Sequence, residues 1–218
     1  MKTTTWNGAG RRIYMQEVGT RDGLQMEQAF VPTEDKIALV NALSAAGLAK
    51  IEVTSFTSPT AIPALRDAEI VMREIERRPG VVYTALVPNM RGAERAIESK
   101  TDELNLVMSA SETHNLANLR MTREQSFTSL AQVVTLAHEA DVEVNVSLSC
   151  VFGCPMEGDV TEAEVFGLVQ RFAELGVGGI TLCDTTGMAY PTQVAKITAA
   201  ARARWPDLAF TLHFHNTR

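Results

Sequence analysis

The chain has 218 residues, of which 45% are hydrophobic and 21% charged, the balance of an ordinary folded globular protein rather than a disordered one. Acidic residues outnumber basic ones by 26 to 20, giving a formal net charge of −6, so neither nucleic acid nor an anionic membrane surface is an expected partner. The sequence has no apolar run near the ~20 residues that span a bilayer and no secretory signal, so the cytoplasm is the expected location.

Short apolar runs of β-forming residues alternate along the chain with longer segments of helical period. In chain order, the sequence predicts strands at Ile13–Val18, Lys50–Ser55, Val81–Val87, Glu103–Ser109, Val142–Ser149, Gly179–Asp184 and Leu208–His215. Between them it predicts helices at Thr33–Ala46, Ile62–Arg78, Arg91–Ser99, Thr122–Ala140, Thr161–Leu175 and Pro191–Arg204. Several bounds carry their own signals: Thr161 and Glu164 match a capping box, Pro191 suits a first helical turn, and Gly47 and Gly176 end helices.

This alternation indicates parallel βαβ units, which build either an open doubly wound sheet or a (β/α)8 barrel. The strand faces favour the barrel. Within Val142–Ser149, one face is apolar and the other is polar (Asn145, Ser147, Ser149). Within Leu208–His215, the polar face is made of Thr211, His213 and His215. A barrel turns such faces inward towards its active site, whereas a central strand of a doubly wound sheet is apolar on both faces.

The number of predicted strands is one short of a closed barrel, which needs eight and typically ~250 residues. We therefore interpret residues 1–218 as a single catalytic domain of the α/β class, a TIM (β/α)8 barrel truncated at its C-terminus. On this interpretation the chain covers about the first seven strands. The alternative is a complete but unusual open sheet.

The three cysteines, Cys150, Cys154 and Cys183, are too few and too odd in number for a disulfide framework. Cys150 and Cys154 are four residues apart, which is not the spacing of a zinc knuckle. We expect reduced thiols in a reducing compartment.

Two histidines near the end of the chain suggest a metal site. His213 and His215 are two apart on a predicted strand, so their side chains leave the same face at its carboxyl end, where barrel active sites lie. Two imidazoles joined by a carboxylate can bind a divalent cation. Asp22, after the first strand, is the candidate carboxylate, although Asp22-Gly23 is also ordinary turn chemistry.

Charged residues at the ends of other strands belong to the same rim. Glu52 lies in the second strand, Asp184 ends the sixth, and Arg21 follows the first. A carboxylate on the inward face needs a partner, and Arg21 is the nearest candidate for Glu52. These residues form either catalytic machinery or a structural network of ion pairs.

Five segments together resemble one family, the 3-hydroxy-3-methylglutaryl-CoA lyases of the metal-dependent superfamily of lyases and Claisen-type condensing enzymes. They are EVGTRDGLQ (17–25), IEVTSFTSP (51–59), SCVFGCPMEG (149–158), CDTTG (183–187) and HFHN (213–216). They run from end to end of the chain in the expected order. The resemblance implies a TIM barrel that cleaves an acyl-CoA substrate, and a possible homo-oligomer.

The resemblance also implies roles for individual residues. Asp22, His213 and His215 match ligands of a divalent cation, Mg²⁺ or Mn²⁺. Arg21, Glu52 and Asp184 match catalytic residues, Arg21 as the group that stabilises the enolate. Gln25 and Ser55 match residues near the substrate. The family's further Asn ligand and catalytic Cys are expected beyond Arg218, and Cys154 does not correspond to that Cys.

Two departures from the family pattern keep alternatives open. Asn216 and Cys183 stand where the familiar lyases often have Asp and Gly. His-x-His-Asn is also the pattern of isopropylmalate and citramalate synthases, yet those usually read RDGEQ where this chain has Leu24. They also lack the SFTSP and GCPMEG segments. A lyase is favoured, and the alternatives are a Claisen-type condensing enzyme and a catalytically silent metal-binding barrel fragment.

Overall fold

The computed structural model describes residues 13–216, and strands and helices alternate along them. The strands are β1 (Gln16–Glu17), β2 (Lys50–Ser55), β3 (Val82–Val87), β4 (Glu103–Ser109), β5 (Glu143–Ser149), β6 (Gly179–Asp184) and β7 (Ala209–Phe214). The helices are α1 (Thr33–Ala45), α2 (Ala68–Glu74), α3 (Met90–Glu98), α4 (Glu112–Leu119), α5 (Arg123–Glu139), α6 (Glu162–Glu174) and α7 (Pro191–Arg204). Strand order follows chain order from β1 to β7. Within residues 13–216, no helix is long and apolar enough to cross a membrane.

The chain divides into two compact units. Of the described residues, 13–105 and 135–143 form the N-terminal unit, and 106–134 and 144–216 form the C-terminal unit. Strand β4 and helix α5 contribute residues to both units.

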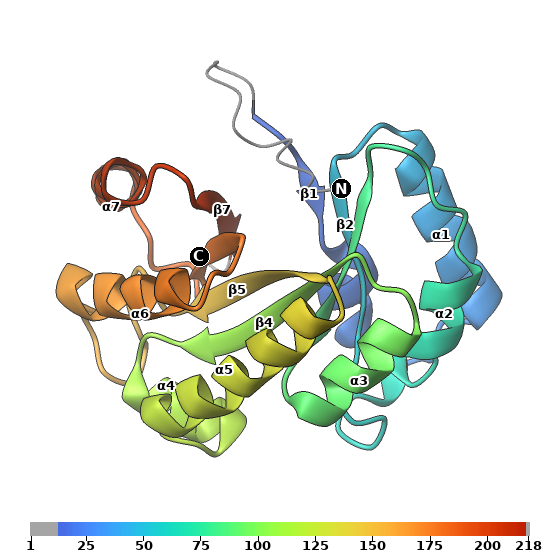
Figure 1. Cartoon of the computed structure of the whole chain (residues 1–218), viewed down its shortest axis with the longest axis horizontal. Coiled ribbons are helices and arrows are strands. Elements are labelled where there is room, and N and C mark those ends of the chain that lie inside the picture. The colour runs from blue at the N-terminus through green and yellow to red at the C-terminus, as the bar shows by residue number, and fades with distance from the viewer. Residues whose placement is uncertain (1–12, 217–218) are drawn as a thin grey trace. The chain divides into compact units, whose positions relative to one another are not determined.

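In the N-terminal unit, helices cover parallel strands. Strand β2 pairs in parallel with β1 and β3, and all six of its residues are buried. Helices α1 and α2 lie side by side against β2, and α3 packs against β3 (Figure 1). Asn89 caps α3 by accepting the Gly92 backbone N–H at 3.0 Å. This layering is that of βαβ units.

In the C-terminal unit, β6 pairs in parallel with β5 and β7. The predicted capping box of α6 is present: Thr161 accepts the Glu164 N–H, and Glu164 in turn accepts the Thr161 N–H. The indole N–H of Trp205, just after α7, donates to Gln170 of α6 at 3.1 Å. The core of this unit includes Val146, Leu148, Ile180, Leu182 and Phe172, each fully buried.

The inner face of β5 is polar and buried, as the strand pattern predicts. Asn145, Ser147 and Ser149 are 9% exposed or less. In a (β/α)8 barrel the outward apolar faces of the strands pack against helices, but Leu212 and Phe214 of β7 are 38% and 48% exposed. The physical reason is position: β7 is the last strand in the sheet order, with β6 as its neighbour.

Two predicted elements differ from the structure, and one helix of the structure was not predicted. Residues 13–15 are not strand, because the chain pairs with β2 only at Gln16 and Glu17 before it turns. The helix predicted at Ile62–Arg78 is a 3-10 turn, η2 (Pro63–Leu65), followed by α2, which ends where Ile75 becomes extended. Helix α4 was not predicted, and its signal was Ser111, whose hydroxyl accepts the His114 N–H at 3.1 Å.

Gly179 allows β5 and β6 to approach closely. A Cβ at this position would lie 2.7 Å from Oδ1 of Asn145 and 3.4 Å from the Ala209 carbonyl oxygen. We therefore expect Gly179→Ala to destabilise the protein by about 1–3 kcal/mol in chemical denaturation, because a buried methyl group must displace its neighbours. Gly167→Ala in α6 is the control: a Cβ there meets nothing within 4 Å, and alanine favours a helix. Equal stability of the two variants would contradict this packing argument.

Candidate active site

A π-helical turn, η1 (Gly19–Gly23), follows β1 and carries two of the predicted site residues. The N–H groups of Arg21 and Asp22 both donate to the Val18 carbonyl, at 3.0 and 2.6 Å. The Thr20 hydroxyl donates to the Glu52 carbonyl at 2.7 Å and fixes the turn to β2. Single π turns of this kind occur frequently at functional sites, and here the turn presents Arg21 and Asp22 at the carboxyl end of β1.

The predicted pairing of Arg21 with Glu52 is confirmed. The Arg21 Nε and Nη2 atoms lie 2.8 and 2.7 Å from Oε2 of Glu52, and Nη1 lies 2.6 Å from Oδ1 of Asp22. The Arg21 and Glu52 side chains are 9% and 3% exposed. Removing one member of such a buried pair leaves an uncompensated charge and typically costs about 3–5 kcal/mol. The three contacts hold the Arg21 guanidinium in one orientation between the carboxylates of Glu52 and Asp22.

The second oxygen of Glu52 contacts Asn105, a residue that the sequence pattern did not indicate. Asn105 of β4 donates from Nδ2 to Oε1 of Glu52 at 2.6 Å, and Asn105 is only 8% exposed. The available signal was an amide within the apolar run of Glu103–Ser109, on the face opposite Leu104 and Leu106.

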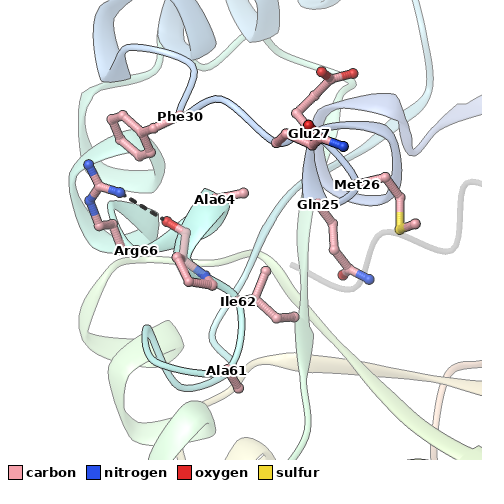
Figure 2. A pocket seen from close by; sticks show the side chains of 10 residues that line it. Gln25, Met26, Glu27, Phe30, Ala61, Ile62, Ala64 and Arg66 are labelled. Carbon is pink, nitrogen blue, oxygen red and sulfur yellow. Dashed lines mark hydrogen bonds between the residues drawn. The ribbon is translucent and has the colours of Figure 1, made fainter.

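Gln25 and Ser55 occupy different surroundings within the N-terminal unit. Gln25 lines a hollow of about 400 Å³ between the segment 25–30 and the segment 61–66 (Figure 2). The Arg66 guanidinium stacks 3.6 Å from the Phe30 ring centroid in its wall. Ser55 is 1% exposed, and its hydroxyl hydrogen-bonds the Thr57 hydroxyl at 2.7 Å. Ser55 therefore shapes the loop after β2, and substrate contacts for both residues stay predictions.

In the C-terminal unit, both histidines lie at the carboxyl end of β7. Their rings stack with centroids 4.8 Å apart and an angle of 12° between the ring planes, as expected for residues two apart on one strand face. The backbone N–H of His215 donates to the backbone carbonyl of Asp184 at 3.3 Å, so the ends of β6 and β7 lie side by side. The unit thus gathers His213, His215 and Asp184 at one edge.

The Asp184 carboxylate is anchored by backbone. Its Oδ1 accepts the N–H groups of Met188 and Ala189, at 2.8 and 3.2 Å, and the residue is 4% exposed. These contacts order the loop between β6 and α7. They are compatible with a purely structural carboxylate, so the catalytic role of Asp184 stays a prediction.

The loop after β5 is clamped onto the start of α4. Glu157 accepts the Thr113 N–H at 2.6 Å, and Ser111 donates to the Cys154 sulfur at 3.1 Å. Hydrogen bonds from the side chain and the backbone N–H of Thr113 lower the pKa of Glu157 to about 2. The carboxylate is therefore charged wherever the protein is folded near neutral pH.

This clamp makes a prediction about acid stability. An unfolded glutamate titrates near pH ~4.3, so the low folded pKa means that Glu157 stabilises the protein above that pH and loses this effect as the pH falls towards about 2. We expect Glu157→Gln to lower the melting temperature at pH 7, and the gap to wild type to shrink below about pH 4. Glu139→Gln, at an exposed position of α5, is the control. A gap that stays constant down to pH 3 would contradict the clamp.

The three cysteines lie inside the fold, and their reduced state stays a prediction. All three are free and buried, and burial raises the pKa of the Cys150 thiol to about 11. A protonated, buried thiol is a poor nucleophile. Burial also opposes ionisation of Cys154, but hydrogen bonds from Ser111 and from the backbone of Met156 and Glu157 outweigh it and lower the pKa of Cys154.

Comparison with known proteins places these residues in a family context. Residues 12–218 match the HMGL-like family. The chain is 46% identical over 208 residues to hydroxymethylglutaryl-CoA lyase YngG of Bacillus subtilis, covering 95% of this chain and 70% of that protein. It is 35% identical over 217 residues to the human mitochondrial hydroxymethylglutaryl-CoA lyase, covering 100% of this chain and 67% of that protein.

A solved structure extends the likeness to three dimensions. An HMG-CoA lyase from Acinetobacter baumannii, in complex with coenzyme A and 3-methylmalate, is 49% identical, with a TM-score of 0.89 over 94% of this chain and 67% of that one. The chain thus spans about two thirds of the length of these relatives. The match confirms the predicted fold class, a TIM barrel. The described residues of this chain supply seven strands of that barrel, β1 to β7.

Proposed function

The chain belongs to the HMGL-like family, and on that premise we propose that it cleaves 3-hydroxy-3-methylglutaryl-CoA to acetoacetate and acetyl-CoA with a divalent cation. The observation that carries the proposal is the Arg21 guanidinium, held between Glu52 and Asp22 on the π turn. Such a fixed, permanently charged group suits a reaction in which negative charge develops on the substrate. The relatives reported above are lyases of this substrate, which favours cleavage over condensation.

The residues available for a metal fit a divalent cation. Asp22 offers a carboxylate oxygen, and His213 and His215 each offer an imidazole nitrogen. The carboxylate oxygen suits Mg²⁺ or Mn²⁺, the two imidazole nitrogens are typical ligands of divalent transition-metal ions, and we propose that these three residues hold the ion. When bound, the cation would lower the pKa of the substrate's tertiary hydroxyl and orient its oxygens.

The reaction is a retro-Claisen cleavage. A base removes the proton of the tertiary hydroxyl, the bond between C2 and C3 breaks, acetoacetate leaves as a ketone, and the electron pair remains on the acetyl-CoA enolate, which an acid protonates. Arg21 would stabilise the negative charge on the enolate oxygen. Asp184, fixed by two backbone N–H groups, would take part in proton transfer, and Gln25 and Ser55 would contact the substrate.

Product analysis tests this proposal. The purified full-length protein is incubated with 3-hydroxy-3-methylglutaryl-CoA and Mg²⁺, and acetoacetate is measured. In parallel, release of free thiol is measured from acetyl-CoA and a 2-oxo acid. We expect acetoacetate in the first assay and no thiol above background in the second. The reverse result would assign a condensing enzyme, and inactivity in both would assign a silent barrel. Homo-oligomerisation and a cytoplasmic location stay predictions.

A further inference from the structure

The Glu52 carboxylate uses its two oxygens for different partners. Oε2 contacts both Nε and Nη2 of Arg21. Oε1 instead accepts a hydrogen bond from Nδ2 of Asn105, at 2.6 Å. Because an ionised carboxylate only accepts hydrogen bonds, each oxygen requires a donor when it is buried. Asn105 therefore satisfies the oxygen that Arg21 does not, and it sets the rotation of the carboxylate about its terminal bond.

The hydrogen bond between Asn105 and Glu52 joins β4 to β2 and passes over β3, the strand between them. Glu52 of β2 is in register with Thr84 of β3, and Asn105 belongs to β4, the next strand in the order. The Thr84 hydroxyl donates away from Glu52, to the Glu103 carbonyl at 2.8 Å. Thr84 has a small side chain whose hydroxyl bonds the backbone of β4, so it leaves Glu52 accessible to the Asn105 amide. Thr84 is not part of the series of contacts that runs from Asn105 through Glu52 to Arg21.

The backbone around Arg21 is fixed independently of Asn105. The Thr20 hydroxyl links the π turn to the Glu52 carbonyl, and the Val18 carbonyl accepts two N–H groups of the turn. Loss of the Asn105 amide would therefore leave the turn in place. It would free the Glu52 carboxylate to rotate and, with it, the guanidinium that Glu52 orients.

We propose that Asn105 is a positioning residue: it aims the Arg21 guanidinium at the reacting oxygen through Glu52, without itself touching the substrate. The inference rests on the proposed function, since it assigns Arg21 to the reaction. Positioning of this kind affects the transition state more than substrate binding, because the guanidinium is needed where the charge develops.

The test compares two replacements of Asn105. Asn105→Ala removes the donor, and we expect kcat to fall about ten- to a hundredfold with KM within about twofold of wild type. Asn105→Asp keeps the size but places a second acceptor-only carboxylate against Glu52, so kcat should fall further. The expected order is wild type, then Ala, then Asp. An Asp variant nearer to wild type than Ala would show that Asn105 only fills space and would overturn the proposal.

Thr84→Val is the matched control, because it removes a buried hydrogen bond in the adjacent strand that does not lead to Arg21. We expect its kcat to equal that of wild type. A loss as large as that of Asn105→Ala would contradict a specific role for Asn105.

A second readout does not depend on turnover. In chemical denaturation, Asn105→Ala, Glu52→Gln and the double variant form a cycle, and we expect the double variant's midpoint shift to be smaller than the sum of the single shifts. Additive shifts would overturn the coupling between Asn105 and Glu52. A wild-type protein that yields no acetoacetate would instead refute the proposed function, while the cycle would still report on the contact.

Discussion

Replacing Asp22 with asparagine is expected to lower divalent-cation binding and to abolish cleavage, with kcat reduced at least roughly a hundredfold. The amide keeps the size of the side chain but removes its negative charge, and Mg²⁺ and Mn²⁺ favour charged oxygen ligands. The substitution also removes one of the two carboxylates that flank the Arg21 guanidinium, at 2.6 Å. Metal content after dialysis and acetoacetate formation are the two measurements.

A matched control separates loss of this ligand from loss of charge in general. Asp35→Asn removes an exposed carboxylate from the first turn of α1 in the same unit, and it should leave metal content and turnover unchanged. Wild-type metal content and turnover in Asp22→Asn would refute the assignment of Asp22 as a ligand.

Arg21→Lys is expected to lower kcat by roughly a hundredfold or more, the size of effect seen when one donor to a developing oxyanion is removed. KM should change little, since the interaction strengthens as the enolate forms. Lysine retains the charge but not the planar fork, and a single ammonium group cannot reproduce the three short contacts to Glu52 and Asp22. Steady-state kinetics with 3-hydroxy-3-methylglutaryl-CoA measures both constants.

The control for this substitution is Arg171→Lys, at a surface arginine of α6 that pairs with Glu124. Exposed ion pairs contribute little, so its kinetics should match wild type. An unchanged kcat in Arg21→Lys would show that Arg21 serves only as the ion-pair partner of Glu52.

The central strands were the most predictable part of the fold. The bounds of β2, β4 and β6 match the predicted ranges, because each is a short segment in which apolar and polar residues mostly alternate, between clear helical segments. Helix α7 also matches, since Pro191 marks its first turn. Local pattern failed where tertiary contacts decide the outcome: in residues 62–78, Asp67 binds Lys36 and Thr33 of α1, and the chain forms two short elements instead of one helix.

The site was predictable wherever neighbouring strands bring their carboxyl ends together. The pairing of Arg21 with Glu52 followed from adjacency of the first two strands, and the shared face of His213 and His215 from the period of a strand. Asn105 was not predictable in this way, because its contact with Glu52 passes over β3 and depends on the small size of Thr84. The roles of Asp184, Gln25 and Ser55 came from the resemblance, and the local geometry around them does not distinguish catalytic from structural use.

The most direct test of the account is product stoichiometry in metal-stripped protein. The full-length protein is treated with a chelator, supplied with 3-hydroxy-3-methylglutaryl-CoA, and assayed for acetoacetate and acetyl-CoA before and after addition of Mg²⁺ or Mn²⁺. We predict no products without the cation and equal amounts of acetoacetate and acetyl-CoA once it is restored. Cleavage that continues without a cation, or no cleavage in its presence, would contradict a divalent-cation-dependent lyase.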